Sequence, residues 1–250
     1  MFRHRVSDHL DLRTVAHWLL LCFVAGNVNS GGYLACHRFV SHVTGFATLA
    51  GIEAAEMRWL DALGVITVPI YFLFGVMISA YFVDRRLHEG RSPRYALVMG
   101  LASLCLFVSA GVGVAGWWGE FGHSLVISRD YFLLALLCMA SGLQNAALTS
   151  SSGSTLRTTH LTGATTDLGI GLVRWWALPS QDTRRETEKR VAVLRLGSIL
   201  SFMLGSTVGA FFYLRWQYAG FFLPAILGLY VTSIAAQQPP LEVASAGSTP

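Results

Sequence analysis

The chain has 250 residues, of which 53% are apolar and only 13% are charged, and its mean hydropathy is +0.51. Soluble domains usually carry about 25% charged residues, so this composition excludes an ordinary soluble protein. The net charge of +4 arises mainly from arginines between apolar stretches. They form no continuous basic face, so we expect no binding to nucleic acid.

Six apolar stretches approach the roughly 20 residues that a helix needs to cross a bilayer. They lie at 15–35, 63–83, 96–118, 131–149, 193–214 and 218–236. Together they predict an all-α integral membrane protein whose first partner is the lipid bilayer. We expect one membrane domain over 1–250, with a disordered tail at 237–250.

The basic residues predict the orientation of these spans. If the N-terminus is cytoplasmic, 14 of the 18 Lys and Arg residues lie in inner segments and 4 lie in outer segments. Inner loops of membrane proteins are enriched in these residues. We therefore expect six spans with both termini in the cytoplasm.

A short motif occurs twice: His-Val-Thr-Gly at 42–45 returns as His-Leu-Thr-Gly at 160–163, an offset of 118 positions. Each copy follows an apolar segment that carries a Gly and an Asn, namely Gly26 with Asn29 and Gly142 with Asn145. We therefore expect a repeat, with copies at about 15–118 and 131–236. Because each copy holds three spans, the two should lie inverted in the membrane, with a site between them.

The repeat continues into spans 2 and 5, where Gly75 and Ser79 match Gly205 and Gly209 at an offset of 130 positions. The 12 residues by which the offset grows fit the charged segment 180–191, which we expect to be a loop. Small residues let helices approach closely in lipid. Spans 2 and 5 should therefore pack tightly, either against each other or in a homodimer.

Glycine and polar residues interrupt spans 1 and 4, at 25–33 and 142–154. They predict that helices 1 and 4 are broken, which is tolerated at membrane depth only inside protein or beside a water-filled cavity. Short helices at 40–51 and 156–173 should begin near the motifs. Their N-terminal amides could bind an anion or a carboxylate.

Polar clusters inside a membrane tend to be functional. The candidate solute-binding residues are Asn27, Asn29, His42, Thr44, Gly45, Gln144, Asn145, His160, Thr162, Gly163 and Asp167. The competing interpretation is that Thr and Asn cap helix ends while Gly lets the chain turn. The two histidines could gate protons or anchor helix ends. Asp167 could couple an ion or form a surface ion pair near Arg174.

No catalytic motif stands out, so we do not expect an enzyme. The four cysteines have no ligand spacing and fit apolar packing. Cys36, His37 and His42 would lack the fourth ligand of a structural metal site. We therefore expect no metal and no cofactor.

These motifs resemble those of the YoaK-like family of bacterial membrane proteins, a group of unknown function. The resemblance rests on Gly26, Asn29 and the segment 39–45, then on Gly-Leu-Gln-Asn at 142–145 and the segment 158–163, and it covers about 20–236. It implies a six-span protein of the bacterial inner (plasma) membrane. The family often has an acid at the position of Asn29 and an Asn at that of Phe46. If that acid couples an ion or a proton to transport, Asn29 cannot do so here, and either this activity is altered or Asp167 takes the role alone.

Two functions remain open. The first is a small secondary transporter or permease for a small polar or anionic solute, with Asn29, Gln144, Asn145 and the Thr-Gly turns lining one cavity. The second is a membrane scaffold or assembly protein, in which the same groups are only hydrogen-bonded caps. A dimeric channel and an intramembrane enzyme are more distant alternatives.

Overall fold

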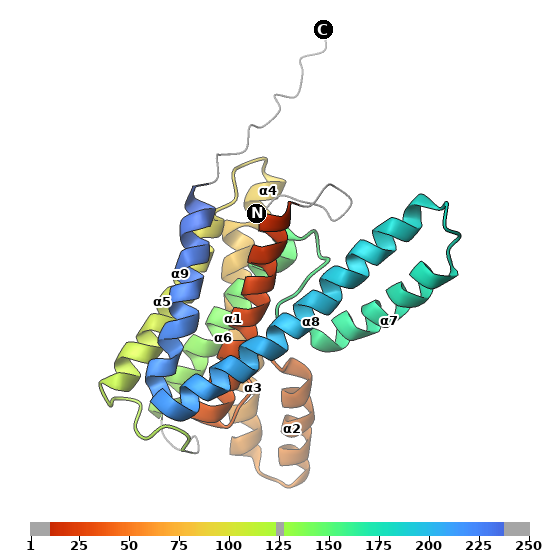
Figure 1. Ribbon diagram of the computed structural model, residues 1–250. Helices are drawn as coiled ribbons and strands as arrows, with labels where there is room; N and C mark the ends of the chain where they lie inside the picture. The colour runs from red at the N-terminus through yellow and green to blue at the C-terminus, as the bar shows by residue number, and fades with distance from the viewer. Residues whose placement is uncertain (1–10, 124–127, 238–250) are drawn as a thin grey trace.

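The computed structural model describes residues 11–123 and 128–237, and the regular elements in these ranges are all helices (Figure 1). The predicted all-α class is therefore confirmed. The elements are α1 (Leu12–Cys36), α2 (Val43–Ala55), α3 (Trp59–Phe82), α4 (Asp84–His88), α5 (Tyr95–Val114), α6 (Ser128–Ser151), α7 (Leu161–Ala177), α8 (Thr183–Trp216), the 3-10 turn η1 (Gln217–Phe221) and α9 (Phe222–Ala236). The tail expected at 237–250 lies almost wholly outside the described residues.

Within the described residues, five segments are long and apolar enough to cross a membrane. They are Leu12–Cys36, Trp59–His88, Tyr95–Val114, Tyr131–Ser151 and Thr183–Ala236. The last of them contains α8, η1 and α9, and the chain reverses its direction at η1 (Figure 1). Helix α1 begins, and α9 ends, at the same end of the bundle (Figure 1).

The predicted breaks inside helices 1 and 4 are wrong. Helix α1 stays helical to Cys36, and α6 stays helical to Ser151. The glycines of α1 serve packing instead: a Cβ at Gly31 would collide with the ring of Tyr213. The chain leaves α1 at His37, whose φ of 53° is left-handed, and it turns after α6 at Gly153, with φ of 58°. The chain therefore departs from helical structure only after these two apolar helices have ended.

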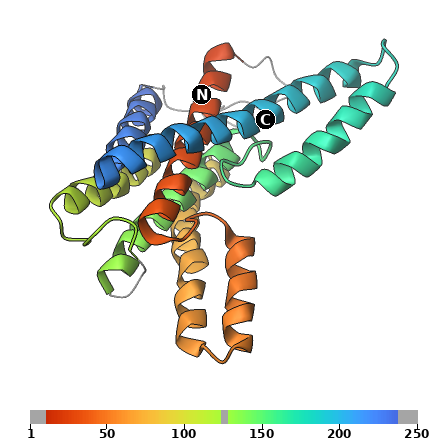
Figure 2. The same ribbon diagram turned by 60° about the horizontal axis from the view of Figure 1, so that its bottom comes forward.

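The charged segment 180–191 is helical from Thr183 onward, so the prediction of a loop is also wrong. Asp182 caps the start of α8 by accepting a hydrogen bond from the amide of Arg184 at 2.9 Å. One turn on, Arg190 donates to Glu186 at 3.3 Å, a spacing that supports helix. The inserted residues lengthen a hairpin: α7 and α8 have 17 and 34 residues, against 13 and 24 in α2 and α3. Figure 2 shows both hairpins projecting from the bundle.

Helices α1 and α8 form one of the two most extensive helix pairs. A Cβ on Gly26 would collide with the carbonyl oxygen of Phe202, and a Cβ on Gly205 would collide with that of Phe23. The two backbones therefore touch directly. Ser206 adds a hydrogen bond of 3.1 Å from its hydroxyl to the carbonyl of Gly26.

Helices α3 and α6 form the other extensive pair and use the same kind of contact. A Cβ on Gly75 would collide with the carbonyl of Met139, and a Cβ on Gly142 with that of Phe72. The contact positions on α1 and α6 differ by 116 (23 and 139, 26 and 142), and those on α3 and α8 differ by 130 (72 and 202, 75 and 205). Tight packing of spans 2 and 5 is thus confirmed. Span 2, which is α3, packs against α6, and span 5, which is α8, packs against α1. The expected interface between α3 and α8 is not found.

We expect Gly26→Ala and Gly142→Ala each to destabilise the protein by about 1–3 kcal/mol, because the added methyl group forces two backbones apart. The measurement is thermal unfolding of the purified protein in detergent. Gly111→Ala is the matched control, since a Cβ there meets nothing within 4 Å. Equal melting temperatures for all three variants would contradict the direct backbone contacts.

Candidate functional site

The two motif segments adopt the same local structure. His42 is the N-cap of α2, with φ −95° and ψ 68°, and His160 is the N-cap of α7, with φ −96° and ψ 62°. Short helices were expected to begin near the motifs, and both do. One turn in, Thr48 donates to the carbonyl of Thr44 at 3.2 Å, and Thr166 donates to that of Thr162 at 3.0 Å.

The glycine of each motif leaves room for the imidazole that precedes it. A Cβ at position 45 would lie 2.6 Å from Nδ1 of His42, and a Cβ at position 163 would collide with the ring of His160. Each ring therefore folds back over the first turn of its own helix. At positions 45 and 163 a side chain would displace the imidazole, so glycine is required there.

Neither helix start is capped by a side chain. The threonines do not occupy the N-cap, so the interpretation of Thr44 and Thr162 as caps is wrong. The first amides bonded to the chain are those of Phe46 and Ala164, which donate to the carbonyls of the motif histidines. In the described part of the chain, the amides at 43–45 and 161–163 have no partner. Such amides at a positive helix end are ready donors to an anion.

Two equivalent hydrogen bonds fix the turns that lead into α2 and α7. The hydroxyl of Ser41 donates to Oδ1 of Asn29 at 3.1 Å, and that of Thr158 donates to Oδ1 of Asn145 at 3.2 Å. Each asparagine thus ties the turn to the long helix before it. The side-chain Nδ2 atoms of both asparagines have no partner among the described residues.

The two helix starts open into one cavity of about 730 Å³, which we call the motif cavity. Figures 1 and 2 show α2 and α7 beginning near each other and diverging. The lining residues come from both motifs and from the paired helices. They are Asn29, Phe39, Ser41, His42, Val43, Thr44, Phe72, Asn145, Arg157, Thr159, His160, Leu161, Thr162 and Phe202.

The electrostatics of the motif cavity favour an anion. Its ionisable lining residues are Arg157, His42 and His160, and no described carboxylate lines it. Arg157 is exposed and forms no ion pair within the described ranges. A guanidinium offers five donors in a planar fork that suits carboxylate and phosphate groups. Among the described lining residues, Arg157 is therefore the one permanently charged side chain, and it shares the cavity with two helix starts whose amides are free to donate.

The candidate residues that do not line the motif cavity are Asn27, Gly45, Gln144, Gly163 and Asp167. Asn27 is fully buried, and its Oδ1 accepts the hydroxyl of Tyr213 at 2.8 Å. Gln144 is buried too, and its Nε2 donates to the carbonyl of Leu21 at 2.5 Å. Both amides thus crosslink helices, although Gln144 was expected beside Asn29 in the cavity.

Asp167 lies on α7, away from the motif cavity. Its carboxylate pairs with Arg195 of α8 at 3.2 Å, and its side chain is 54% exposed. Arg174, the partner considered from the sequence, instead approaches Glu188 at 3.8 Å. Both pairs join the α7–α8 hairpin, and exposed pairs of this kind contribute only about 0–1 kcal/mol.

Several lining residues were not among the sequence candidates, notably Arg157, Phe39, Phe72 and Phe202. The repeat contained a signal for all four, since 72 and 202 differ by the 130 positions of spans 2 and 5, and 39 and 157 by the 118 positions of the motifs. The last pair is chemically unlike. Phe39 stacks on Tyr33 with ring centroids 4.6 Å apart, whereas its counterpart supplies the guanidinium.

The length and composition of its helices define the chain as a multi-pass membrane protein. A family model described as a protein of unknown function (DUF1275) matches residues 17–234, and the chain belongs to that family. Membership of a family of unknown function, expected over 20–236, is thereby confirmed. No curated protein and no solved structure matches the chain.

We expect Thr44→Cys and Thr162→Cys to react with a small water-soluble thiol reagent, because both positions are exposed and line the motif cavity. Asn27→Cys should stay unmodified, since Asn27 is fully buried. Mass spectrometry of the intact protein measures the reaction, and the four native cysteines, all buried, give little background. Protection of both threonine positions would show that the cavity is closed to water.

Proposed function

We propose that this protein is a small secondary transporter or permease that binds a small anionic or polar solute in the motif cavity. The observation that carries the proposal is the pair of uncapped helix starts that open, with Arg157, into one cavity without a described carboxylate. Half-helix N-termini that point at an anionic group are a recurring feature of transporter sites.

We further propose that the chain is an inverted repeat, with the motif cavity between its copies. Support comes from contacts that occur once in each half of the chain: the glycine contacts, the asparagine hydrogen bonds and the histidine N-caps. Each copy would consist of three spans and the helix that follows the first span. These are α1, α2, α3 and α5 in the first copy, which also contains the short α4, and α6, α7, α8 and α9 in the second. With an odd number of spans the copies are antiparallel, as in many transporters.

In this proposal α8 and α9 are separate spans, so the membrane is crossed six times. An even number of crossings agrees with α1 beginning and α9 ending at the same end of the bundle (Figure 1). The 14 to 4 distribution of basic residues favours the cytoplasm for that end. The resemblance to YoaK-like proteins favours the bacterial inner membrane.

The alternative is a scaffold or assembly protein, and the hydrogen bonds of Asn29 and Asn145 favour it. Both side chains fix turns, which a purely structural motif would also require. This alternative gives no reason for the unpartnered amides or for the unpaired Arg157 at the cavity. Ligand binding therefore separates the two functions.

We expect inorganic or organic anions to raise the melting temperature of the purified protein. The probes are phosphate, sulfate, nitrate and acetate. A ligand at about 100 times its Kd stabilises the folded state by about 2.7 kcal/mol. Arg157→Gln removes a charge-assisted hydrogen bond of about 1.5–3 kcal/mol, so the Kd of the stabilising anion should rise roughly tenfold to hundredfold.

Arg215→Gln is the matched control, because Arg215 is also exposed but does not line the cavity. Thr44→Val combined with Thr162→Val tests the helix starts separately from the arginine. Absence of stabilisation by every anion would reject the solute site in favour of the scaffold.

We expect the tips of the two hairpins to face opposite sides of the membrane. Glu56→Cys lies between α2 and α3, and Glu186→Cys lies in the first turn of α8. A membrane-impermeant thiol reagent added to intact cells should label Glu56→Cys only, and it should label both variants after permeabilisation. Labelling of both from the same side would end the inverted-repeat proposal.

A further inference from the structure

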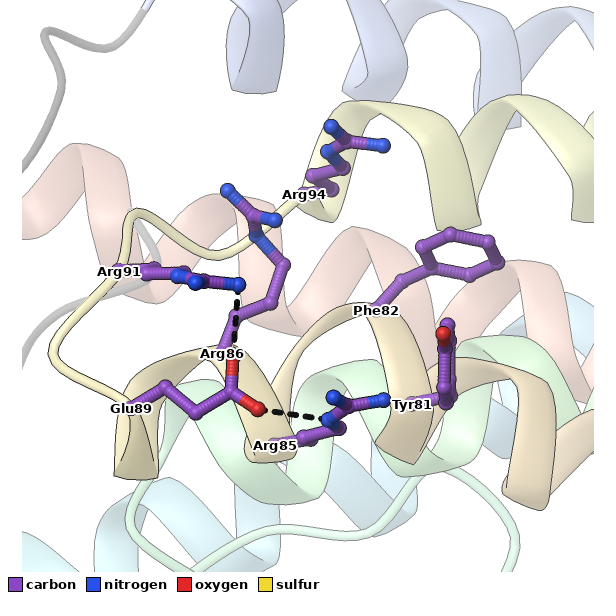
Figure 3. A pocket seen from close by; sticks show the side chains of 7 residues that line it. All are labelled: Tyr81, Phe82, Arg85, Arg86, Glu89, Arg91 and Arg94. Atoms are coloured by element: carbon purple, nitrogen blue, oxygen red, sulfur yellow. Dashed lines mark hydrogen bonds and ion pairs between the residues drawn. The ribbon is translucent and has the colours of Figure 1, made fainter.

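A second pocket, of about 190 Å³, lies where α3 ends and α5 begins. We call it the arginine pocket. Its lining side chains are Tyr81, Phe82, Arg85, Arg86, Glu89, Arg91 and Arg94 (Figure 3). It lies at the end of the bundle where α1 begins and α9 ends, far from the hairpin tip of α2 (Figure 1).

The arginine pocket holds four guanidinium groups and one carboxylate. Glu89 accepts from Nε of Arg85 at 2.7 Å and pairs with Arg91 at 3.1 Å. The hydrogen bond from Arg85 and the nearby positive charges hold the pKa of Glu89 below its usual range, so this carboxylate stays ionised. The lining residues therefore carry three positive charges in excess.

The remaining two arginines leave donors free. Nε of Arg86 donates to the carbonyl of Ser92 at 2.8 Å, which fixes the side chain but leaves its terminal nitrogens without a described partner. The side chain of Arg94 has no partner in the described ranges. Asp84 forms no ion pair with either arginine in the described ranges; it accepts the hydroxyl of Ser150 on α6 at 2.7 Å and does not line the pocket. Figure 3 shows the guanidinium groups of Arg86 and Arg94 near each other.

An exposed apolar stripe leads away from the arginine pocket along α3. Phe74, Met77 and Tyr81 are 53%, 56% and 55% exposed, and their spacing of three and four residues puts them on one face. Tyr81 belongs to both features, since it lines the pocket and its ring lies 4.9 Å from the guanidinium carbon of Arg85. Tyrosine is typical of the membrane–water interface.

We propose that the arginine pocket binds the phosphate of an anionic phospholipid, whose acyl chain lies along the Phe74–Tyr81 stripe. Excess positive charge at the end of an apolar helix matches a molecule that is anionic at one end and apolar at the other. A soluble phosphate would bind the arginines but make no contact with the adjoining stripe. This site is separate from the motif cavity and does not depend on what that cavity binds.

The test is thermal unfolding of the full chain in mixed micelles that contain phosphatidylglycerol or, as the neutral comparison, phosphatidylcholine. We expect phosphatidylglycerol to stabilise the protein more. Arg91→Gln combined with Arg94→Gln should weaken that effect roughly tenfold or more in lipid concentration, since each basic residue near an anionic surface contributes about a factor of five. Arg94→Lys, which keeps the charge, should retain most of the effect, and Arg215→Gln should retain all of it.

Glycerol phosphate supplies the same anion without acyl chains. We expect it to compete only at concentrations far above those of the lipid. Competition at equal concentration would reject a lipid in favour of a soluble anion. Equal stabilisation by the two lipids, or full retention of the phosphatidylglycerol effect in the double arginine variant, would overturn the site.

Discussion

At four points a glycine on one helix contacts a backbone carbonyl of the helix packed against it. The arrangement of the remaining helices depends on these contacts. Lipid chains are as apolar as the helix surfaces, so no hydrophobic force drives such helices together, and close van der Waals packing must do so. The contacts join α1 to α8 and α3 to α6. Each hairpin is thereby anchored through its long helix, while α2 and α7 begin close together over the motif cavity.

The sequence predicted what depends on local pattern. Apolar stretches located α1, α3, α5, α6, α8 and α9, since helix length is set by bilayer thickness. The recurrence of His-x-Thr-Gly located the starts of α2 and α7. It also identified Asn29, Asn145 and both threonines as residues of one cavity, although they are far apart along the chain.

The errors concern tertiary packing, which a single sequence does not contain. Gly26 and Gly31 suggested a broken helix because their partners, Phe202 and Tyr213, are nearly 200 positions away. Gln144 resembled a site residue because nothing local reveals that Leu21 offers it a carbonyl. The charged start of α8 resembled a loop because it lacks an apolar stretch, although Glu186 and Arg190 have the spacing of a helical ion pair. Arg157 escaped notice because its counterpart in the repeat is a phenylalanine.

The length of α8 has a consequence for how movements within this protein can be observed. Its 34 residues make a rod of about 51 Å, well beyond the roughly 30 Å of the hydrocarbon layer. Phe202, which lines the motif cavity, lies 19 residues, or about 28 Å, from Thr183 at the charged end of the same rod. Because the helix is continuous, it works as a lever arm. A slight rotation of α8 at the cavity becomes a larger displacement at that end, where a spin label or fluorophore would report on the cavity without touching it.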